Sequence, residues 1–295
     1  MLAGLQQVVD PAELTAVVNV GDDTVLHGLH ISPDLDTCTY TLAGAINPET
    51  GWGLVGESWH AMTALERYGG LTWFRLGDKD LATHLYRTHR LREGAALSTI
   101  TAEITRGWEL GLRMIPVTDD PLSTVVTLAE GGSVSFQDYF VRLQHGVAIT
   151  GVAFAGSDTA RPAPGVIDAI AGATTVVIAP SNPIVSIGPL LAVNGVRDAI
   201  TARRDRTVAV SPIIGGAALK GPADRMLREL GHDVSVVGVA RLYAELAAVL
   251  VIDEVDAALA DEVAAAGIRP VIAPTIMSTP ERAAALGRTV LECLS

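Results

Sequence analysis

Short apolar runs bounded by Gly and Pro recur along the chain, and segments with a helical spacing of apolar residues separate them. This alternation is typical of a parallel sheet wrapped by helices, because parallel neighbours need a crossover connection. The expected strands are 15–20, 149–154, 174–179, 207–210, 234–237, 249–252 and 270–272. The expected helices are 166–170, 195–202, 223–230, 240–246, 259–266 and 280–294.

Composition narrows the fold class. Hydrophobic residues make up 49% of the chain and charged residues 18%, which favours strands covered on both faces. We expect an α/β, Rossmann-like fold: a mostly parallel sheet with helices on both faces. The length fits a single domain, 1–295, with a helical insertion at about 47–110. A hairpin is expected at about 125–142, where Glu130-Gly131-Gly132 separates two β-prone runs.

The acidic balance restricts the partners. A net charge of -12 leaves no basic face for nucleic-acid or membrane phosphates, so neither partner is expected. An anionic small molecule would need backbone amides, the few Lys and Arg, or a metal. No apolar run approaches the roughly 18 residues that span a bilayer, and no signal peptide is recognisable, so the cytoplasm is the expected location.

Acidic residues gather after the first expected strand. The segment VVNVGDD supplies Asp22 and Asp23, and SPDLDT supplies Asp34 and Asp36. Carboxylate oxygens are the ligands that Mg²⁺ shares with substrate phosphates. The alternative is that these residues only form turns and helix caps. Both interpretations stay open on spacing alone.

A second acidic motif, GDKDLATH, leads into a predicted helix that runs to about residue 92. Asp80 and His84 are four residues apart and share one helix face. They are either a pair of ligands or a capping and surface pair, and the motif by itself favours the second.

Two polar loops follow later strands. Ligands of open parallel sheets bind beyond the carboxyl ends of the strands, where loop amides and helix N-termini meet anions. The two loops should lie side by side, since their strands are expected to be neighbours. The candidate binding residues of the loop at 179–189 are Ser181, Asn182, Ser186 and Gly188, and those of the loop at 211–222 are Ser211, Gly215 and Lys220.

Several common motifs are absent from the sequence. It contains neither the P-loop pattern GxxxxGK[ST] nor the dinucleotide pattern GxGxxG. It also lacks the GxSxG elbow of serine hydrolases and the HExxH motif of zinc peptidases. The acidic motifs and the two polar loops together favour phosphoryl or nucleotidyl chemistry.

Taken in order, VVNVGDD, ISPDLDT, LGDKDLATH, APSNPIVSIGP and SPIIGGAALKGPA resemble the 2-phospho-L-lactate transferase family of coenzyme F-420 biosynthesis. The resemblance runs from about residue 2 to the C-terminus. It implies transfer of a phospholactate or phosphoenolpyruvate unit from a guanosine-diphosphate-linked donor to 7,8-didemethyl-8-hydroxy-5-deazariboflavin, with release of GMP. The acid of the donor and the existence of a homodimer are left open.

The resemblance also implies roles for individual residues. Asp36 and Lys79 would contact the deazaflavin acceptor, and Asp80 would also bind substrate. Asp22 with Asp36 would hold Mg²⁺ and act in catalysis. Asp36→Ala is expected to abolish turnover with the fold intact. Family members more often have Arg at the position of Lys79, and Lys keeps the charge but loses the planar fork.

One departure concerns the start of the chain. The family begins with a strand and a glycine-rich loop of the type GGxGGxK, whereas this sequence starts at the helix after that loop. We therefore expect a longer native product, residues from about 2 in a helix, and an open slot beside 15–20. Two alternatives remain at this point: a non-catalytic, UDP-sugar-binding regulator of the same fold, and an inactive truncated transferase.

Overall fold

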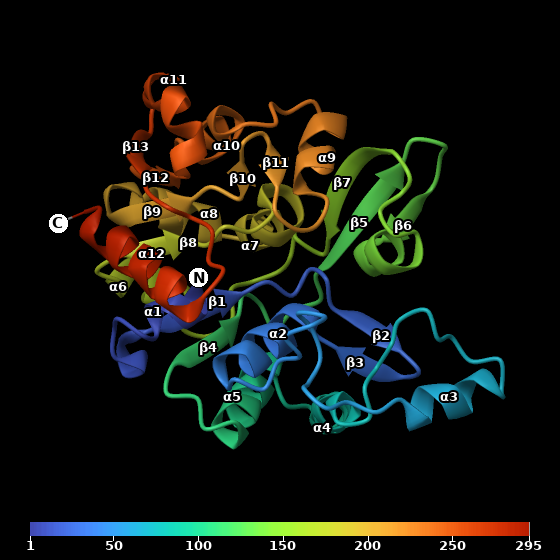
Figure 1. Ribbon diagram of the computed structural model, residues 1–295. Helices are drawn as coiled ribbons and strands as arrows, with labels where there is room; N and C mark the ends of the chain where they lie inside the picture. Colours follow the sequence, from blue (N-terminus) through green and yellow to red (C-terminus); the bar gives the residue numbers. More distant parts are fainter. Residues whose placement is uncertain (295) are drawn as a thin grey trace.

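The computed structural model describes residues 1–294, and its centre is a sheet of four parallel strands (Figure 1). The strands are β8 (Val176–Ile178), β9 (Thr207–Val210), β12 (Val249–Ile252) and β13 (Arg269–Ile272). Their order across the sheet is β13-β12-β9-β8. In the parallel register, Val208 lies opposite Val177 on one side and Val249 on the other. Every residue of the two central strands, β9 and β12, is buried.

Helices cover both faces of this sheet. Val208 and Val249 pack with Leu286 near the C-terminus, whereas Ala209 and Leu250 belong to the larger core on the other face. The expected α/β fold is thereby confirmed. Within the described residues no helix is long and apolar enough to cross a membrane. The helices of this half are α6 (Val166–Gly172), α7 (Gly188–Ala192), α8 (Val196–Thr201), α9 (Ala223–Glu229), α10 (Val236–Tyr243), α11 (Ala260–Ala265) and α12 (Pro280–Glu292).

The expected strand at 234–237 is wrong, because α10 begins there. Ser235 caps the helix: its Oγ accepts the backbone N–H groups of Val237 and Gly238, both at 3.1 Å. Val236 and Val239 are buried in the large core. Packing of the helix against the sheet therefore overrides the β preference of a valine-rich run.

Near the N-terminus, a parallel pair of strands lies apart from the main sheet. β1 (Thr15–Val18) pairs with β4 (Arg113–Pro116), its one strand partner within residues 1–294. The helix α1 (Leu2–Leu5) precedes β1 and packs on α12, where a Cβ on Gly4 would meet the carbonyl oxygen of Ala283 at 2.2 Å. The chain is helical from Leu2, and the second edge of β1 has no strand partner within the described residues.

The stretch after β1 is mainly helical and forms the lower part of the molecule in Figure 1. A short antiparallel hairpin, β2 (Thr24–Leu26) and β3 (Leu29–Ile31), opens it. Three of its four helices lie within the expected insertion at 47–110, and the last of them packs on β4. The helices are α2 (Pro33–Leu42), α3 (His60–Glu66), α4 (Asp80–Arg92) and α5 (Leu97–Gly107).

A three-stranded antiparallel sheet, β6-β5-β7, forms the right-hand part of Figure 1. Its strands are β5 (Ser123–Leu128), β6 (Ser133–Ser135) and β7 (Ile149–Ala155). Two expectations need correction here. The run 149–154 is a strand, but it pairs antiparallel with β5 outside the parallel sheet. The second strand of the expected hairpin ends at Ser135, and Asp138–Arg142 form a π-helical turn in which Tyr139 is buried.

Gly21, just after β1, connects this part of the chain to the antiparallel sheet. Its carbonyl oxygen accepts the N–H of Thr124 on β5 at 2.7 Å. A Cβ on Gly21 would lie 2.8 Å from both Pro189 Cβ and Thr124 Oγ1, so only glycine allows this close approach.

We predict that Gly21→Ala lowers the free energy of unfolding by about 1 to 3 kcal/mol, because the added methyl group overpacks this contact. Gly107→Ala is the matched control. It ends a helix, and its Cβ would meet nothing within 4 Å, so it should be neutral or slightly stabilising. Denaturant unfolding measures both, and equal stabilities of the two variants would contradict the packing argument.

Candidate functional site

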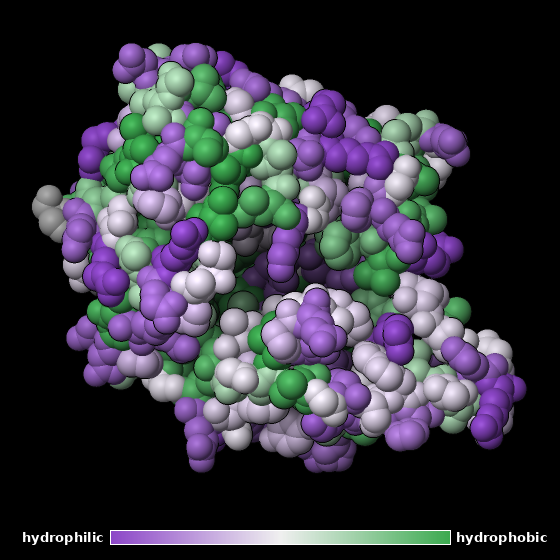
Figure 2. Space-filling model, viewed as in Figure 1, coloured by the Kyte–Doolittle hydropathy of each residue, from purple (hydrophilic) through white to green (hydrophobic). Residues whose placement is uncertain are grey.

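A cavity of about 700 Å³ opens at the carboxyl ends of the parallel strands, within the range for small-molecule sites. Figure 2 shows a hollow between the upper and lower parts of the molecule. Residues of the loops after β8, β9 and β13 line the cavity, together with Asp22, Asp34, Phe136 and Phe140. The cavity thus lies where the fold class places a ligand.

The structure gathers many of the predicted binding residues in this cavity. β8 and β9 are hydrogen-bonded neighbours, so the loops that follow them lie side by side at its wall. The predicted residues that line the cavity are Asp22, Ser181, Asn182, Ser186, Ser211 and Lys220.

Two predicted glycines have structural tasks beside the cavity. Gly188 packs against Phe154, whose Cζ atom would lie 2.8 Å from an added Cβ. The N–H of Gly215 donates to Asp256 Oδ2 at 2.9 Å, so that amide is already engaged within the protein. The structure therefore gives neither residue a place in the cavity lining.

The loop that carries Lys220 is shaped by a very short hairpin, β10 (Ile213–Ile214) and β11 (Ala217–Ala218). Its turn residues, Gly215 and Gly216, have φ values of +57° and +78°, which a type I′ turn requires and glycine adopts without strain. Lys220 lies at the cavity and approaches the loop of the helical insertion: a Cβ on Gly51 would be 3.9 Å from its Nζ. Lys220 therefore lies between the loop after β9 and the helical insertion.

Two carboxylates face the same cavity. Asp22 follows β1, and Asp34 belongs to the first turn of α2. Burial and the charge of Asp34 raise the pKa of Asp22 well above its ordinary value. Burial also raises the pKa of Asp34 to about 6. Asp22 Oδ1 is buried and has no hydrogen-bond partner within the described residues. No positively charged side chain of that part of the chain is among the main influences on the pKa of either carboxylate.

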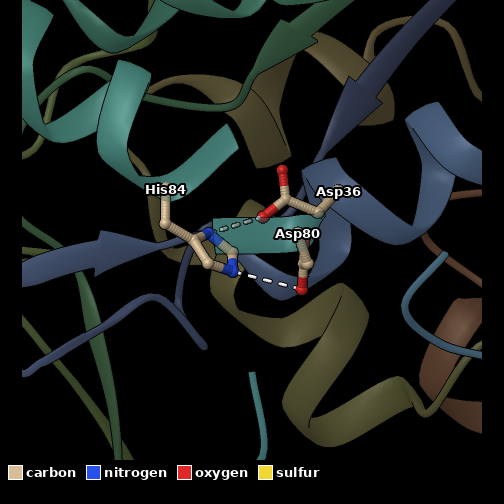
Figure 3. A group of neighbouring side chains, drawn as sticks. All are labelled: Asp36, Asp80 and His84. Carbon is tan, nitrogen blue, oxygen red and sulfur yellow. Dashed lines mark ion pairs between the residues drawn. The ribbon is translucent and has the colours of Figure 1, made fainter. Parts of the chain in front are cut away.

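Asp36, by contrast, lies in a buried network between α2 and α4. Its carboxylate forms an ion pair with Arg87, whose Nη1 donates to Asp36 Oδ2 at 3.1 Å. His84 Nδ1 lies 3.6 Å from the same oxygen, and His84 Nε2 lies 3.2 Å from Asp80 Oδ2 (Figure 3). Tyr40 donates its hydroxyl to Asp80 at 2.6 Å. Asp80 and His84 are thus a buried pair rather than a surface pair.

The ligand atoms of Asp36, Asp80 and His84 all lie within 4.8 Å of one another, close enough to hold a metal. Arg87, however, already supplies a positive charge at this position and also lies 3.4 Å from His84 Nδ1. Burial would raise the pKa of Asp80, but His84 and Tyr40 hold it below its ordinary value. The charges of this network are therefore compensated by the protein, unlike those of Asp22 and Asp34.

Lys79 lies outside the cavity lining. Its Nζ donates to the carbonyl oxygen of Val55 at 3.0 Å, and its backbone N–H donates to Glu57. Glu57 also accepts the N–H of Asp80, so its carboxylate satisfies the first amides of α4. GDKD thus has a clear structural role at a helix N-terminus.

Sequence reasoning missed several residues of the cavity. Phe136 and Phe140 form part of its wall with rings stacked at 5.5 Å. The loop after β13 contributes Thr275 to Ser278, and Asp253 fixes this loop by accepting the N–H and hydroxyl of Thr275 at 2.8 and 2.9 Å. The sequence could have indicated this loop, because it follows an expected parallel strand.

A family model described as 2-phospho-L-lactate transferase CofD matches residues 1–289. The chain belongs to this family. Phosphoenolpyruvate transferases of Nocardia farcinica and Mycobacterium ulcerans are 42% and 43% identical to it, over 99% of this chain in each case and 90% and 92% of their own lengths.

Solved structures agree on the fold. Two crystal structures of the Bacillus halodurans protein BH3568 match this chain with TM-scores of 0.59 and 0.61. They cover 98% of this chain and 96% and 94% of their own, at 14% and 16% identity. At this identity the likeness shows the fold alone.

CofD family membership confirms the resemblance carried by the five motifs. The chain is a transferase of a phospholactate or phosphoenolpyruvate unit in coenzyme F-420 biosynthesis, and the non-catalytic regulator is not favoured. The roles of individual residues stay predictions. The predicted metal site of Asp22 and Asp36 has an alternative in the pair Asp22 and Asp34. Asp22 and Asp34 both line the cavity, whereas Asp36 is paired with Arg87.

We predict that Asp36→Ala lowers the free energy of unfolding by about 3 to 5 kcal/mol, because it leaves the Arg87 guanidinium buried without its partner. This revises the expectation that the fold stays intact. Asp233→Ala, which removes the partner of Arg241 from an exposed pair, should cost no more than about 1 kcal/mol. Denaturant unfolding compares the variants, and a wild-type stability of Asp36→Ala would contradict the assignment.

We also predict that Asp34→Asn raises the melting temperature at pH 8 in the absence of divalent ions. The raised pKa of Asp34 means that the folded chain binds this proton more tightly than the unfolded chain. Its contribution to stability is present below about pH 4 and is lost as the pH rises through about 6. Asp34→Asn should therefore have little effect at pH 4. Thermal melts in EDTA test this, and destabilisation at pH 8 would contradict it.

Proposed function

We propose that this transferase moves a phosphoenolpyruvate unit from a guanosine-diphosphate-linked donor to the ribityl hydroxyl of 7,8-didemethyl-8-hydroxy-5-deazariboflavin and releases GMP. The observation that carries the proposal is one cavity of about 700 Å³ shared by the polar loops, Lys220 and two uncompensated carboxylates. Phosphoenolpyruvate is preferred to phospholactate because relatives at about 42% identity are named phosphoenolpyruvate transferases.

The loops after β8, β9 and β13 are suited to the donor. The hydroxyls of Ser181, Ser186 and Ser278, backbone amides and Lys220 provide donors to a diphosphate within a chain of net charge -12. Asn182 keeps one loop rigid, since its Oδ1 accepts the N–H groups of Ile184 and Val185. Ser211 does the same for the next loop through the N–H and carbonyl of Ile213. Such preorganised donors lower the cost of ordering the site.

Asp22 and Asp34 fit a divalent cation, and we assign Mg²⁺ to them. The unpartnered Asp22 Oδ1 and the raised pKa of both carboxylates indicate a place that lacks positive charge. Hard oxygen ligands from one or two carboxylates, completed by substrate phosphate, are the usual coordination of Mg²⁺. When bound, the ion would neutralise charge on the transferring phosphoryl group.

The chemical step then needs positioning more than covalent help. The acceptor oxygen forms a bond to the phosphorus next to the enolpyruvyl group, and the bond from that phosphorus to the GMP oxygen breaks. GMP leaves with the electron pair, and the acceptor's hydroxyl proton passes to a carboxylate of the Asp22 and Asp34 pair. Lys220 lies on the same cavity wall as the diphosphate loops and stabilises the negative charge of the leaving group.

The test is a reconstituted reaction of the full chain with deazaflavin, Mg²⁺ and each guanylylated donor acid, analysed by mass. The proposal expects the phosphoenolpyruvyl product together with GMP. Product from the lactyl or glyceryl donor alone would overturn the choice of acid. An absence of product with every donor would support the inactive alternative.

We predict that Lys220→Ala raises the KM for the donor at least tenfold and the KM for the deazaflavin less than twofold, because a charge-assisted contact to phosphate is lost. Initial rates at saturating concentrations of the other substrate measure both constants. Arg228→Ala on α9 is a control that also removes one positive charge, outside the cavity lining. A larger effect on the acceptor KM would move Lys220 to the acceptor side.

A further inference from the structure

Asn19 lies at the end of β1 and is buried, with 5% of its surface exposed. Its Oδ1 accepts the backbone N–H of Gly21 at 2.8 Å, and its Nδ2 donates to Asp34 Oδ2 at 2.8 Å. One amide side chain therefore joins the turn that carries Asp22 to the helix that carries Asp34.

The chemistry of this link requires an amide. A buried side chain must accept from one group and donate to a carboxylate at the same time, and Asn offers both atoms on a short stem. An aspartate at position 19 could still accept from Gly21 but would repel Asp34, and a serine could not span both partners. The residue type is therefore matched to its two contacts.

The remaining contacts of the turn fix its backbone from the other side. Gln137, itself buried, donates its Nε2 to the carbonyl oxygen of Asp22 at 3.1 Å. The N–H of Thr124 donates to the carbonyl oxygen of Gly21 at 2.7 Å. Both contacts hold the backbone of the turn. Asp23 also joins the turn to the start of α2, since the Ser32 hydroxyl donates to Asp23 Oδ2 at 2.6 Å, whereas Asn19 bonds to the second carboxylate itself.

Asp22 is buried and Asp34 is half-buried, and their two carboxylates, which share a cavity, repel each other when ionised. Without a cation the two segments gain by moving apart. The bond from Asn19 to Asp34 opposes this separation. Side chains that orient the ligands of a metal commonly change its affinity by 10- to 100-fold.

We infer that Asn19 is a positioning residue that holds Asp22 and Asp34 together for a divalent cation before the ion arrives. The inference rests on the proposed metal site and adds a residue that acts on that site through its ligands. Asn19 touches neither the ion nor the substrates, so its effect appears in metal affinity rather than in substrate binding.

The test measures Mn²⁺ binding to the full chain by the loss of the free-ion EPR signal, for wild type, Asn19→Ala and Asn19→Ser. Both variants should weaken Mn²⁺ binding at least tenfold. The matched control is Asn194→Ala, since the side chain of Asn194 donates to the Asp158 carbonyl outside the cavity lining. That variant should bind Mn²⁺ like wild type.

Kinetics separate positioning from a purely structural role. At saturating Mg²⁺ the Asn19 variants should regain turnover and show substrate KM values within about twofold of wild type, because excess metal compensates a weakened site. Melting temperatures in EDTA verify that the variants fold; if Asn19→Ala does not, Asn19→Ser carries the test.

The outcomes distinguish this inference from the proposed function. Wild-type Mn²⁺ affinity in a folded Asn19 variant overturns the role of Asn19 alone. Loss of activity that excess Mg²⁺ does not restore also overturns it. A wild-type protein that binds no Mn²⁺ overturns the metal site of Asp22 and Asp34 itself.

Discussion

The repulsion between Asp22 and Asp34 is the constraint on which the rest of the site depends. Two carboxylates without a compensating charge, one buried and one half-buried, are unfavourable, and here the fold brings them together from the turn after β1 and from α2. The surrounding contacts of Asn19, Gly21 and Gln137 hold that arrangement in place. In the proposed function, this loss of stability is what allows the pair to bind a cation, and with it an anionic substrate, in an acidic protein.

Two aspartates only two residues apart have opposite surroundings. Asp34 faces the cavity from the first turn of α2, and Asp36 faces α4, where Arg87 neutralises it. Asp34 therefore belongs to a site whose charge is not neutralised by the protein. Asp36 belongs to a network that joins α2 to the helical insertion. The network holds α2, the helix that carries Asp34, against α4.

Much of the fold could be predicted because a buried parallel sheet leaves a simple signal of apolar runs between helical segments. The positions of Ser181 and Lys220 followed from the same logic, since parallel strand ends converge. The strand expected at 234–237 failed because the cap at Ser235 and burial outweigh the β preference of valine. The different surroundings of Asp34 and Asp36 depend on Arg87, which lies 51 residues from Asp36 in the chain, and no local pattern carries that pairing.

The most direct test of this account is the location of a bound cation. A crystal soaked in Mn²⁺ and measured at the manganese absorption edge would show the ion by its anomalous signal. The account predicts a peak between the carboxylates of Asp22 and Asp34, at the wall of the cavity that holds Lys220 and the polar loops. A peak among Asp36, Asp80 and His84, with Arg87 displaced and none at Asp22, would contradict it.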